Sequence, residues 1–218
     1  MLSKSKFIRG EKCRKSLWLY VHQPDLAFVP ASQQAIMNRG TNIGVVARDY
    51  FPGGIMAVEG DYPTAESARR TLELIEQGVE TIYEATFIFD DTLVAVDILA
   101  KIDGNWQLFE CKGSATVKPY HIRDIAVQVY VVTGAGIPLI DAFVMHLNSG
   151  YVRRGDLNLQ QLFICRSVFP KVQLMQPDIP LRLAELKEML NQAEPVIEMG
   201  KYCESPYPCD FKEYCKTL

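Results

Sequence analysis

Three short runs of strand-forming residues, separated by acidic turn sequences, constrain the fold of this chain more than any other feature. The runs are Thr81 to Phe89, Leu93 to Lys101 and Asn105 to Lys112, all rich in Val, Ile, Leu and Phe. Asp90-Asp91 and Asp103-Gly104 separate them, and Asp-Gly is among the strongest signals for a two-residue hairpin turn. The pattern predicts a three-stranded antiparallel meander.

Two-residue turns also determine which residues face each other across this meander. Counting outward from the second turn places Asp97 opposite Glu110, and counting outward from the first places Glu84 opposite Asp97. Directly opposed side chains share one face of a sheet, with Cβ atoms about 5 Å apart. The alternation of side chains adds Lys112 to that face and turns Cys111 away from it. The meander is therefore predicted to present three carboxylates in a row beside a lysine.

Like charges stacked in this way destabilise a sheet, and the neighbouring residues on all three strands are mostly apolar. A divalent cation would remove the repulsion, because Mg²⁺ takes oxygen ligands and retains several waters. The alternative is that the acids are separate surface residues whose ion-pair partners are Lys101 and Lys112, since exposed charge is the norm. The grouping of three acids beside a lysine favours the cation site.

The rest of the chain predicts helices around the meander and more strands after it. Helical periodicity and capping residues predict five helices: Cys13 to Val21, Ser32 to Tyr50, Ala65 to Glu76 with Thr64 as N-cap, Pro119 to Thr133 and Pro180 to Ala193. Further strands are predicted at Leu139 to Leu147 and around Leu159 to Val168. Helices that cover a small mixed sheet make an α/β domain.

Charge and hydropathy limit the classes of function. The net charge is −3, which argues against a globally basic nucleic-acid coat protein. The sequence contains no apolar run near the roughly 18 residues that a membrane span needs, so no membrane association is expected. The first residues lack the apolar core of a signal peptide. We therefore expect a cytoplasmic protein, in which cysteines bind metal more often than they form disulfides.

Basic residues gather at the N-terminus, and histidines are few. The basic residues within the first 15 positions are Lys4, Lys6, Arg9, Lys12, Arg14 and Lys15. Their charge alone predicts a solvated arm, and the alternative is a segment that follows a nucleic-acid backbone. The three histidines show no ligand spacing and are interpreted as structural: His22, His121 and His146.

Two motifs resemble a known class of enzyme. The run Val96-Asp97-Ile98-Leu99 precedes Phe109-Glu110-Cys111-Lys112 by thirteen residues, and it resembles the hydrophobic-D…E-x-K core of PD-(D/E)XK nucleases. The stretch from Asp124 to Tyr130 contains Gln128 and is similar to the Gln-containing motif of the RecB-like exonucleases. That branch includes the AddB nuclease domain and the CRISPR-associated iron–sulfur exonucleases. The resemblance extends from Cys13 to Cys215.

The resemblance implies a fold and an activity. The fold is a restriction-endonuclease-like mixed sheet flanked by helices, in a single domain over residues 1–218 with its nuclease core at about 79–170. The activity is Mg²⁺- or Mn²⁺-dependent hydrolysis of DNA, exonucleolytic on single strands or ends. Asp97 and Glu110 would hold the cation, with the backbone carbonyl of Cys111 as a further ligand. Lys112 would orient the attacking water and neutralise developing charge, and Gln128 would position the water or a phosphate.

The sequence departs from the RecB-like pattern at two positions. Gly44 stands where the family places a histidine, and Val132 stands where it places a tyrosine. Glu84 is the predicted replacement for the missing histidine ligand, because the strand register places it next to Asp97. The alternative is a nucleic-acid-binding module that has kept the fold but lost strong catalysis.

Four cysteines are predicted to form a second metal centre. Cys203, Cys209 and Cys215 are separated by five residues each, and Cys13 is the best candidate for a fourth ligand. The resemblance implies a [4Fe–4S] cluster that joins segments 10–22 and 200–218, although the family usually opens its tail triad with C-x₂-C. The second interpretation is a zinc-stapled interaction protein, but structural zinc sites use shorter spacings between cysteines. The third interpretation is that the four cysteines are free thiols. The remaining cysteines, Cys111 and Cys165, are predicted to pack in the core.

Overall fold

The computed structural model describes residues 1–30 and 42–218, which form a mixed seven-stranded sheet with helices on both faces. The strand order is β2-β3-β4-β5-β6-β7, and β1 joins the sheet beside β4. The strands are β1 (Leu2–Ser3), β2 (Ile55–Met56), β3 (Thr81–Phe89), β4 (Thr92–Ile102), β5 (Asn105–Lys112), β6 (Leu139–Leu147) and β7 (Phe163–Ser167). The pairs β1–β4, β2–β3 and β5–β6 are parallel, and the others are antiparallel.

The predicted meander and its register are confirmed. Both turns have two central residues with positive φ, at 47° and 46° for Asp90 and Asp91 and at 49° and 78° for Asp103 and Gly104, as a type I′ turn requires. The pairs that close the turns are Phe89 with Thr92 and Ile102 with Asn105. Because no residue is inserted between a turn and the acids, the register holds along the strands.

Helices cover both faces of this sheet. They are α1 (Lys4–Lys12), α2 (Arg14–His22), α4 (Ala65–Glu76), α5 (Pro119–Gly134), α6 (Leu159–Leu162), α7 (Phe169–Met175), α8 (Ile179–Leu190) and α9 (Lys212–Cys215), with 3₁₀ turns η1 (Pro24–Leu26) and η2 (Lys201–Cys203). The larger hydrophobic core lies between the sheet and α1, α4, α5 and α8. A smaller core lies on the other face, under α6 and helical residues 42–48.

The sequence interpretation was wrong or incomplete at several elements. The basic N-terminal arm is not a free solvated segment, because residues 2–12 form β1 and α1. The stretch expected as a strand around Leu159 to Val168 begins with α6 and continues as β7, and α7 was not predicted. The last long helix ends at Leu190 rather than Ala193. The first part of the helix predicted over Ser32 to Tyr50 lies outside the described residues.

The edge of β4 that faces β5 is shared between two strands. β5 pairs with β4 over residues 98–102, and β1 pairs with the same edge at Thr92 and Leu93. Residues 94–97 of β4 lie between these two partners. β1 runs parallel to β4, so the residues after β1 continue alongside residues 94–97 of β4. β5 runs antiparallel to β4, so its last residues approach the same part of β4 from the opposite direction. The sheet thus opens locally where Asp97 and Glu110 stand.

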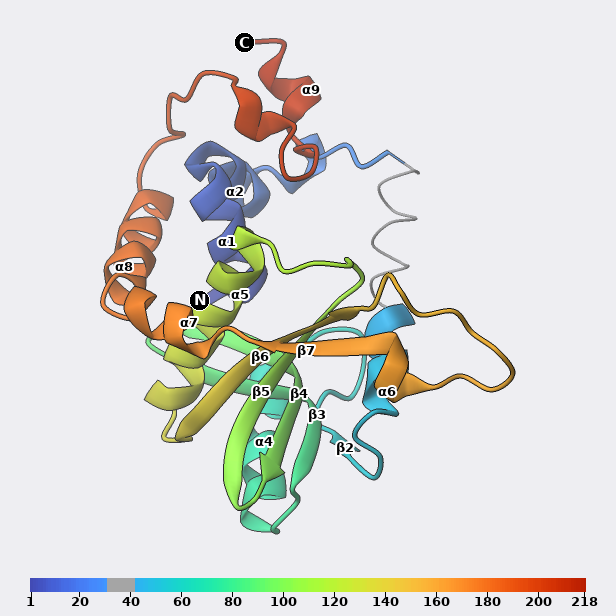
Figure 1. The fold of residues 1–218 in the computed structure, drawn as a ribbon. Coiled ribbons are helices and arrows are strands. Elements are labelled where there is room, and N and C mark those ends of the chain that lie inside the picture. The colour runs from blue at the N-terminus through green and yellow to red at the C-terminus, as the bar shows by residue number, and fades with distance from the viewer. Residues whose placement is uncertain (31–41) are drawn as a thin grey trace.

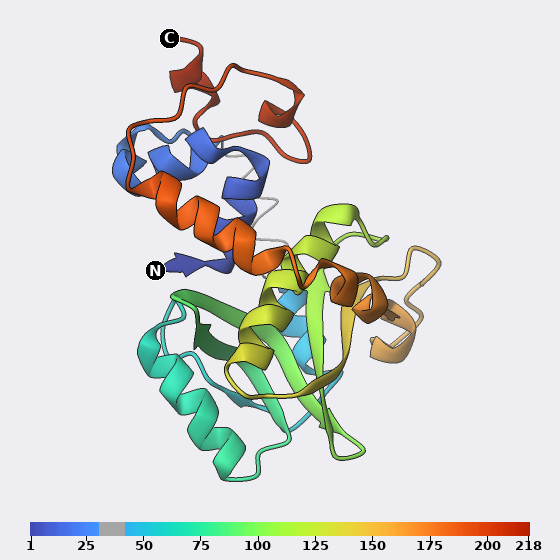
Figure 2. The ribbon, with the colours of Figure 1, turned by 90° about the vertical axis from the view of Figure 1, so that its left-hand side faces the viewer.

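The two ends of the chain pack together beside the sheet. Figure 1 shows α2 and the C-terminal tail with α9 stacked at the top, and in Figure 2 the long helix α8 runs from the sheet toward them. The guanidinium of Arg9 on α1 donates to both carboxylate oxygens of Asp210, at 2.7 and 2.8 Å. Protein contacts therefore join the ends, and a metal cluster between them stays a prediction. Within the described chain, no helix combines the length and the apolar character that crossing a membrane requires.

Candidate functional site

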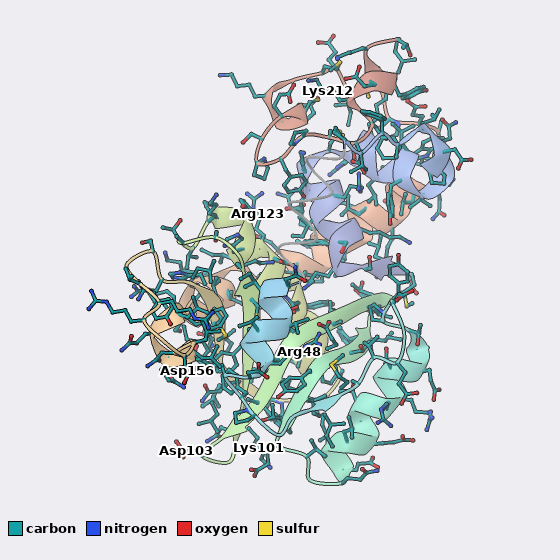
Figure 3. All side chains as sticks on the ribbon, turned by 90° about the vertical axis from the view of Figure 1, so that its right-hand side faces the viewer. Arg48, Lys101, Asp103, Arg123, Asp156 and Lys212 are labelled. Carbon is teal, nitrogen blue, oxygen red and sulfur yellow. The ribbon has the colours of Figure 1, made fainter. Side chains whose placement is uncertain are left out.

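The predicted catalytic side chains meet where the sheet opens. Asp97 lies on β4, Glu110 and Lys112 lie on β5, and Gln128 reaches them from α5, which covers this face of the sheet. Figure 2 shows α5 in front of the strands, and Figure 3 shows the opposite side of the sheet, with Arg123 near the start of α5 and the hairpin tip at Asp103 at the other end of the strands. The site therefore combines two neighbouring strands with the helix that follows them in sequence.

Glu110 is the centre of this group. Its side chain is 3% exposed. Its Oε1 accepts hydrogen bonds from Lys112 at 2.7 Å and Lys4 at 3.0 Å, and its Oε2 accepts from Gln128 at 2.9 Å and Lys4 at 3.1 Å. Burial alone would raise the pKa of Glu110, but the charges of Lys112 and Lys4 outweigh it and hold this pKa well below its usual range. Glu110 is therefore a carboxylate at every physiological pH.

Asp97 has the opposite electrostatic character. Its carboxylate accepts a hydrogen bond of 2.7 Å from the backbone N–H of Cys111, in the region where the ladder between β4 and β5 has ended. Burial, followed by the negative charges of Glu110 and Glu84, raises the pKa of Asp97 to about 7, although Lys4 acts against the shift. Two adjacent carboxyl groups with pKa values on opposite sides of the normal range are characteristic of functional sites.

Two residues complete the polar lining of the site. The ammonium of Lys112 donates to Asp124 at 2.5 Å as well as to Glu110, so it is held between two acids. Gln128 is fully buried, and its amide also donates to the Asp124 backbone carbonyl at 3.2 Å. The Oε1 atom of Gln128 has no hydrogen-bond partner among the described residues. Such an orphaned acceptor is costly and fits a site that a bound water or ligand completes.

The structure does not join Glu84 to this hydrogen-bonded group. Glu84 lies opposite Asp97 in register, but its φ is +52° and its carboxylate accepts from Arg48 at 2.9 Å. Figure 3 shows Arg48 on the short helix in front of the strands. In the described parts of the chain, no three His, Cys, Asp or Glu side chains are arranged to hold a metal ion. The ligand roles of Glu84 and of the Cys111 carbonyl stay predictions.

The remaining carboxylates still fit a hard cation. Mg²⁺ is commonly bound through one or two carboxylates and keeps several of its waters. Asp97 and Glu110 supply two such groups on adjacent strands, and the free oxygen of Gln128 lies in the same site. The donor set therefore matches Mg²⁺ or Mn²⁺ with a partly hydrated coordination shell.

The sequence interpretation missed Lys4. Its side chain is 20% exposed and binds Glu110 from the first turn of α1. Burial alone would lower the pKa of Lys4, but Asp124 and Glu110 raise it above its usual value, so the side chain stays charged. A cluster of basic residues was visible near the N-terminus, but nothing in the sequence distinguished Lys4 from its neighbours, because its partner lies 106 positions away.

The other basic residues of the N-terminal segment are mostly paired with acids. Arg9 binds Asp210, Arg14 binds Glu185 at 2.5 Å and Lys15 binds Glu194 at 2.9 Å. Lys12 donates to the backbone carbonyl of Tyr207 at 2.5 Å. These contacts correct the prediction of a solvated arm, because the side chains hold the N-terminal helices against the rest of the protein. The alternative, that the segment follows a nucleic-acid backbone, stays a prediction.

The four cysteines predicted to share a metal line one pocket. Cys13, Cys203, Cys209 and Cys215 surround it together with Lys15, Ser16, Tyr202 and Phe211 among others. Burial, and then the neighbouring cysteines, raise the pKa of the Cys215 thiol, while Lys15 lowers it. The four side chains therefore meet in space although Cys13 lies far from the others in sequence.

The other cysteines and the histidines occupy structural positions. Cys111 and Cys165 pack against the smaller hydrophobic core. The Nδ1 atom of His121 accepts from the backbone N–H of Lys118 at 3.2 Å, at the start of α5. His22 and His146 each hydrogen-bond a backbone carbonyl at 3.0 Å. These contacts agree with the interpretation that the histidines are structural.

Comparison with solved structures finds distant similarity to two proteins of known structure. The alkaline exonuclease LHK-Exo from Laribacter hongkongensis is 15% identical, with 81% of this chain and 88% of that chain covered at a TM-score of 0.42. SSO0001 is 11% identical, with 98% and 85% covered at a TM-score of 0.48. No protein-family model matches the sequence, and no curated protein matches it. Similarity at this level does not assign a function.

Proposed function

We propose that this protein is a divalent-cation-dependent nuclease that hydrolyses phosphodiester bonds in DNA. The observation that carries the proposal is that Glu110 binds Lys112 and Gln128 directly, and that Asp97 lies close enough for the charge of Glu110 to raise its pKa. Burying acids and a lysine together is costly unless each is paired, and here the pairing leaves an acceptor of Gln128 unsatisfied. A site of this kind has the ligands for a hard cation and a positive charge for a phosphate.

Each residue has a distinct task in the proposed reaction. Asp97 and Glu110 hold the cation, with Glu84 and the backbone carbonyl of Cys111 as further proposed ligands. A bound Mg²⁺ or Mn²⁺ activates water and stabilises charge on the phosphoryl oxygens. Lys112, which Glu110 and Asp124 hold in place, neutralises the charge that develops on phosphorus. Gln128 offers its free Oε1 to the attacking water.

The substrate and the setting follow from the RecB-like resemblance. We propose single-stranded DNA or DNA ends as the substrate, with exonucleolytic cleavage. A cytoplasmic location agrees with this proposal, because reducing conditions keep cysteines free of disulfides and available to bind metal. The bond cleaved, the strand polarity and the cation are all accessible to one assay on end-labelled oligonucleotides.

We also propose that Cys13, Cys203, Cys209 and Cys215 bind a [4Fe–4S] cluster with a structural role. A single zinc ion requires all four sulfurs at about 2.3 Å from one point. The four cysteines of a cluster instead bind different iron atoms and stand farther apart. Cys13, Cys203, Cys209 and Cys215 line one pocket, and the resemblance to the CRISPR-associated iron–sulfur exonucleases favours a cluster there. Metal binding there would be coupled to folding of the tail.

The nuclease proposal is tested with the purified protein on labelled single-stranded DNA in Mn²⁺. We expect cleavage that EDTA abolishes, and we expect Asp97→Ala, Glu110→Ala and Lys112→Ala each to lose at least about a hundredfold in rate. Glu73→Ala, an exposed acid on α4, is the control and should cleave like the wild type. Cation-independent cleavage, or full activity in the first two variants, would refute the proposal.

The cluster proposal is tested by anaerobic purification followed by iron and sulfide analysis. We expect a brown protein with about four irons per chain. Serine at any of the four pocket cysteines should remove the colour and lower solubility, whereas Cys165→Ser should keep the colour. Stoichiometric zinc without iron would instead support the zinc-stapled alternative.

A second candidate function is a DNA-binding module with weak or absent catalysis. Gly44 favours it, because glycine stands at the position where the RecB-like pattern places a histidine ligand. The site therefore lacks the imidazole that the RecB-like pattern provides. Cation-dependent DNA binding without cleavage, under conditions in which the wild type binds Mn²⁺, would establish this function.

A further inference from the structure

Lys4 occupies the site in a way that the proposed roles of the other residues do not explain. Its ammonium lies almost equally far from the two carboxylate oxygens of Glu110, at 3.0 and 3.1 Å, and 3.9 Å from Asp124. Lys112 already supplies the lysine that the PD-(D/E)XK pattern requires. The site therefore contains a second ammonium group, which comes from the N-terminal segment of the chain.

The position of Lys4 is built into the fold. Leu2 is buried, and β1 pairs with the start of β4, so the chain is fixed immediately before Lys4. The Ser3 hydroxyl then caps α1 by accepting from the backbone N–H of Lys6 at 3.3 Å. Because β1 and β5 share one edge of β4, the residue that follows β1 enters the interval in which Glu110 stands.

Lys4 also completes the hydrogen bonding of Glu110. An ionised carboxylate offers about four acceptor positions. Lys4 uses one on each oxygen, and Lys112 and Gln128 use the other two. A cation can therefore take an oxygen of Glu110 only if one of these donors withdraws.

Lys4 is the donor that can withdraw most easily. Lys112 is also bound to Asp124 at 2.5 Å, and Gln128 is also bound to the backbone of α5 at 3.2 Å. Lys4 has no second partner closer than 3.9 Å among the described residues, and its long side chain is partly exposed. A cation on Glu110 would repel both lysines, but only Lys4 is free to turn toward solvent or substrate.

We propose that Lys4 is a phosphate-binding residue of the nuclease site, which binds Glu110 until a divalent cation replaces it and then binds a backbone phosphate of the DNA. This inference rests on the proposed function, because it needs a cation on Glu110 and a phosphate substrate. With Asp97 ionised, the three acids Asp97, Glu110 and Asp124 and the two lysines carry one net negative charge. A divalent cation reverses that sign, and one DNA phosphate then neutralises the site.

The experiment compares Lys4→Gln with the wild type in two binding measurements. Mn²⁺ affinity is measured without DNA by isothermal titration calorimetry. We expect Lys4→Gln to bind Mn²⁺ roughly tenfold more tightly, because a charge-assisted competitor for Glu110 is gone. DNA affinity is measured with a fluorescent single-stranded oligonucleotide and Ca²⁺ in place of Mn²⁺. Here we expect Lys4→Gln to bind roughly tenfold more weakly.

Two further variants separate this role from a structural one. Lys4→Arg keeps the charge and should restore DNA binding to near the wild-type level. Lys6→Gln is the matched control on the same helix, because its side chain makes no hydrogen bond or ion pair within the described chain. It should leave both affinities unchanged. Thermal melts of all variants identify any that fail to fold. If Lys4→Gln does not fold, the DNA affinity of Lys4→Arg is the test instead.

The outcomes distinguish this proposal from the proposed function. Wild-type affinity of Lys4→Gln for either Mn²⁺ or DNA overturns the role of Lys4 and leaves the nuclease proposal intact. A wild-type protein that binds no Mn²⁺ overturns the nuclease proposal, and the role of Lys4 with it.

Discussion

At the scale of single residues, the unusual backbone of Glu84 is the most informative feature. A non-glycine residue with a φ of +52° inside a strand costs about 1–3 kcal/mol, and such strain tends to persist at functional sites. The flanking pairs, Tyr83 with Ile98 and Ala85 with Val96, keep the register on both sides. The register is kept, but the alternation of side chains reverses here, because Tyr83 and Ile98 pack in the smaller core and Ala85 and Val96 pack in the larger one. The carboxylate of Glu84 is bound by Arg48.

The pairing with Arg48 leads to opposite predictions for the two partners. If Glu84 contributes to cation binding, Glu84→Ala should weaken Mn²⁺ affinity by roughly tenfold, as the loss of a supporting residue around a metal commonly does. Arg48→Ala should strengthen it, because the carboxylate is then released and a competing positive charge is gone. Calorimetric titration with Mn²⁺ measures both changes. Arg69→Ala on α4 is the control, and equal affinities in all variants would assign Glu84 a purely structural role.

At the scale of elements, the start of helix α5, which carries Gln128 of the candidate site, is predicted to depend on pH. The helix begins at Pro119, and its first turn is closed by the Lys118 N–H donating to the Nδ1 atom of His121. Burial, and then the charges of Lys112 and Lys118, lower the pKa of His121 to about 4, with Glu110 acting against the shift and His146 adding to it. A protonated Nδ1 cannot accept this hydrogen bond.

This arrangement predicts how stability depends on pH. The unfolded chain protonates His121 near its ordinary pKa of about 6.5, whereas the folded protein holds it neutral down to about 4. The unfolded state therefore binds more protons between these values, and the free energy of unfolding should fall as pH drops from 6.5 to 4. Urea unfolding across this range measures the effect.

A matched pair of variants assigns the effect to His121. His121→Gln keeps an acceptor at the third helical position, where Gln commonly closes a capping box, but it does not titrate. We expect it to match the wild type near pH 7 and to show a shallower loss of stability in acid. His22→Gln, at the exposed end of α2, should leave the pH profile unchanged; an unchanged slope in His121→Gln would contradict the assignment.

At the scale of the whole molecule, the C-terminal tail depends on the N-terminal helices for its place. Arg9 joins Asp210 through two hydrogen bonds in a partly buried setting, and its guanidinium also donates to Ser16 at 3.0 Å. Phe211 is fully buried beside this pair. Helix α1 begins at Lys4 and is followed directly by Cys13. It therefore connects the candidate active site with the cysteine pocket.

We predict that Arg9→Ala loosens the tail and destabilises the protein by about 2 kcal/mol, the scale of a hydrogen-bonded charged pair with limited solvent access. Urea unfolding measures the loss, and limited proteolysis should show faster cleavage of the tail. Arg14→Ala is the matched control, because its pair with Glu185 is nearly half exposed, at 46% and 49%, and should contribute less than about 1 kcal/mol. Equal losses in both variants would show that Arg9 has no special role in holding the tail.

The sequence by itself determined the meander and its register, but not the direction of every acidic side chain on it. Turn type and side-chain alternation are local properties, so Asp103-Gly104 and the strands on either side specify a register without help from the rest of the chain. The Thr64 cap of α4 was predicted for the same reason, and the structure adds that Ser67 closes a capping box there. These local rules placed Asp97, Glu110 and Lys112 on two neighbouring strands, but they did not predict the irregular backbone at Glu84.

Only the tertiary structure decided which distant groups complete the site. Lys4 reaches Glu110 because β1 pairs with β4, and Arg48 reaches Glu84 from another helix. Such contacts depend on packing between elements, and several basic residues in the sequence were equally plausible partners for the same acids. Attraction between opposite charges does not determine which basic residue pairs with which acid. The burial of apolar residues such as Leu2 determines the partner, because it fixes where each element packs, and this happens only once the whole sheet has formed.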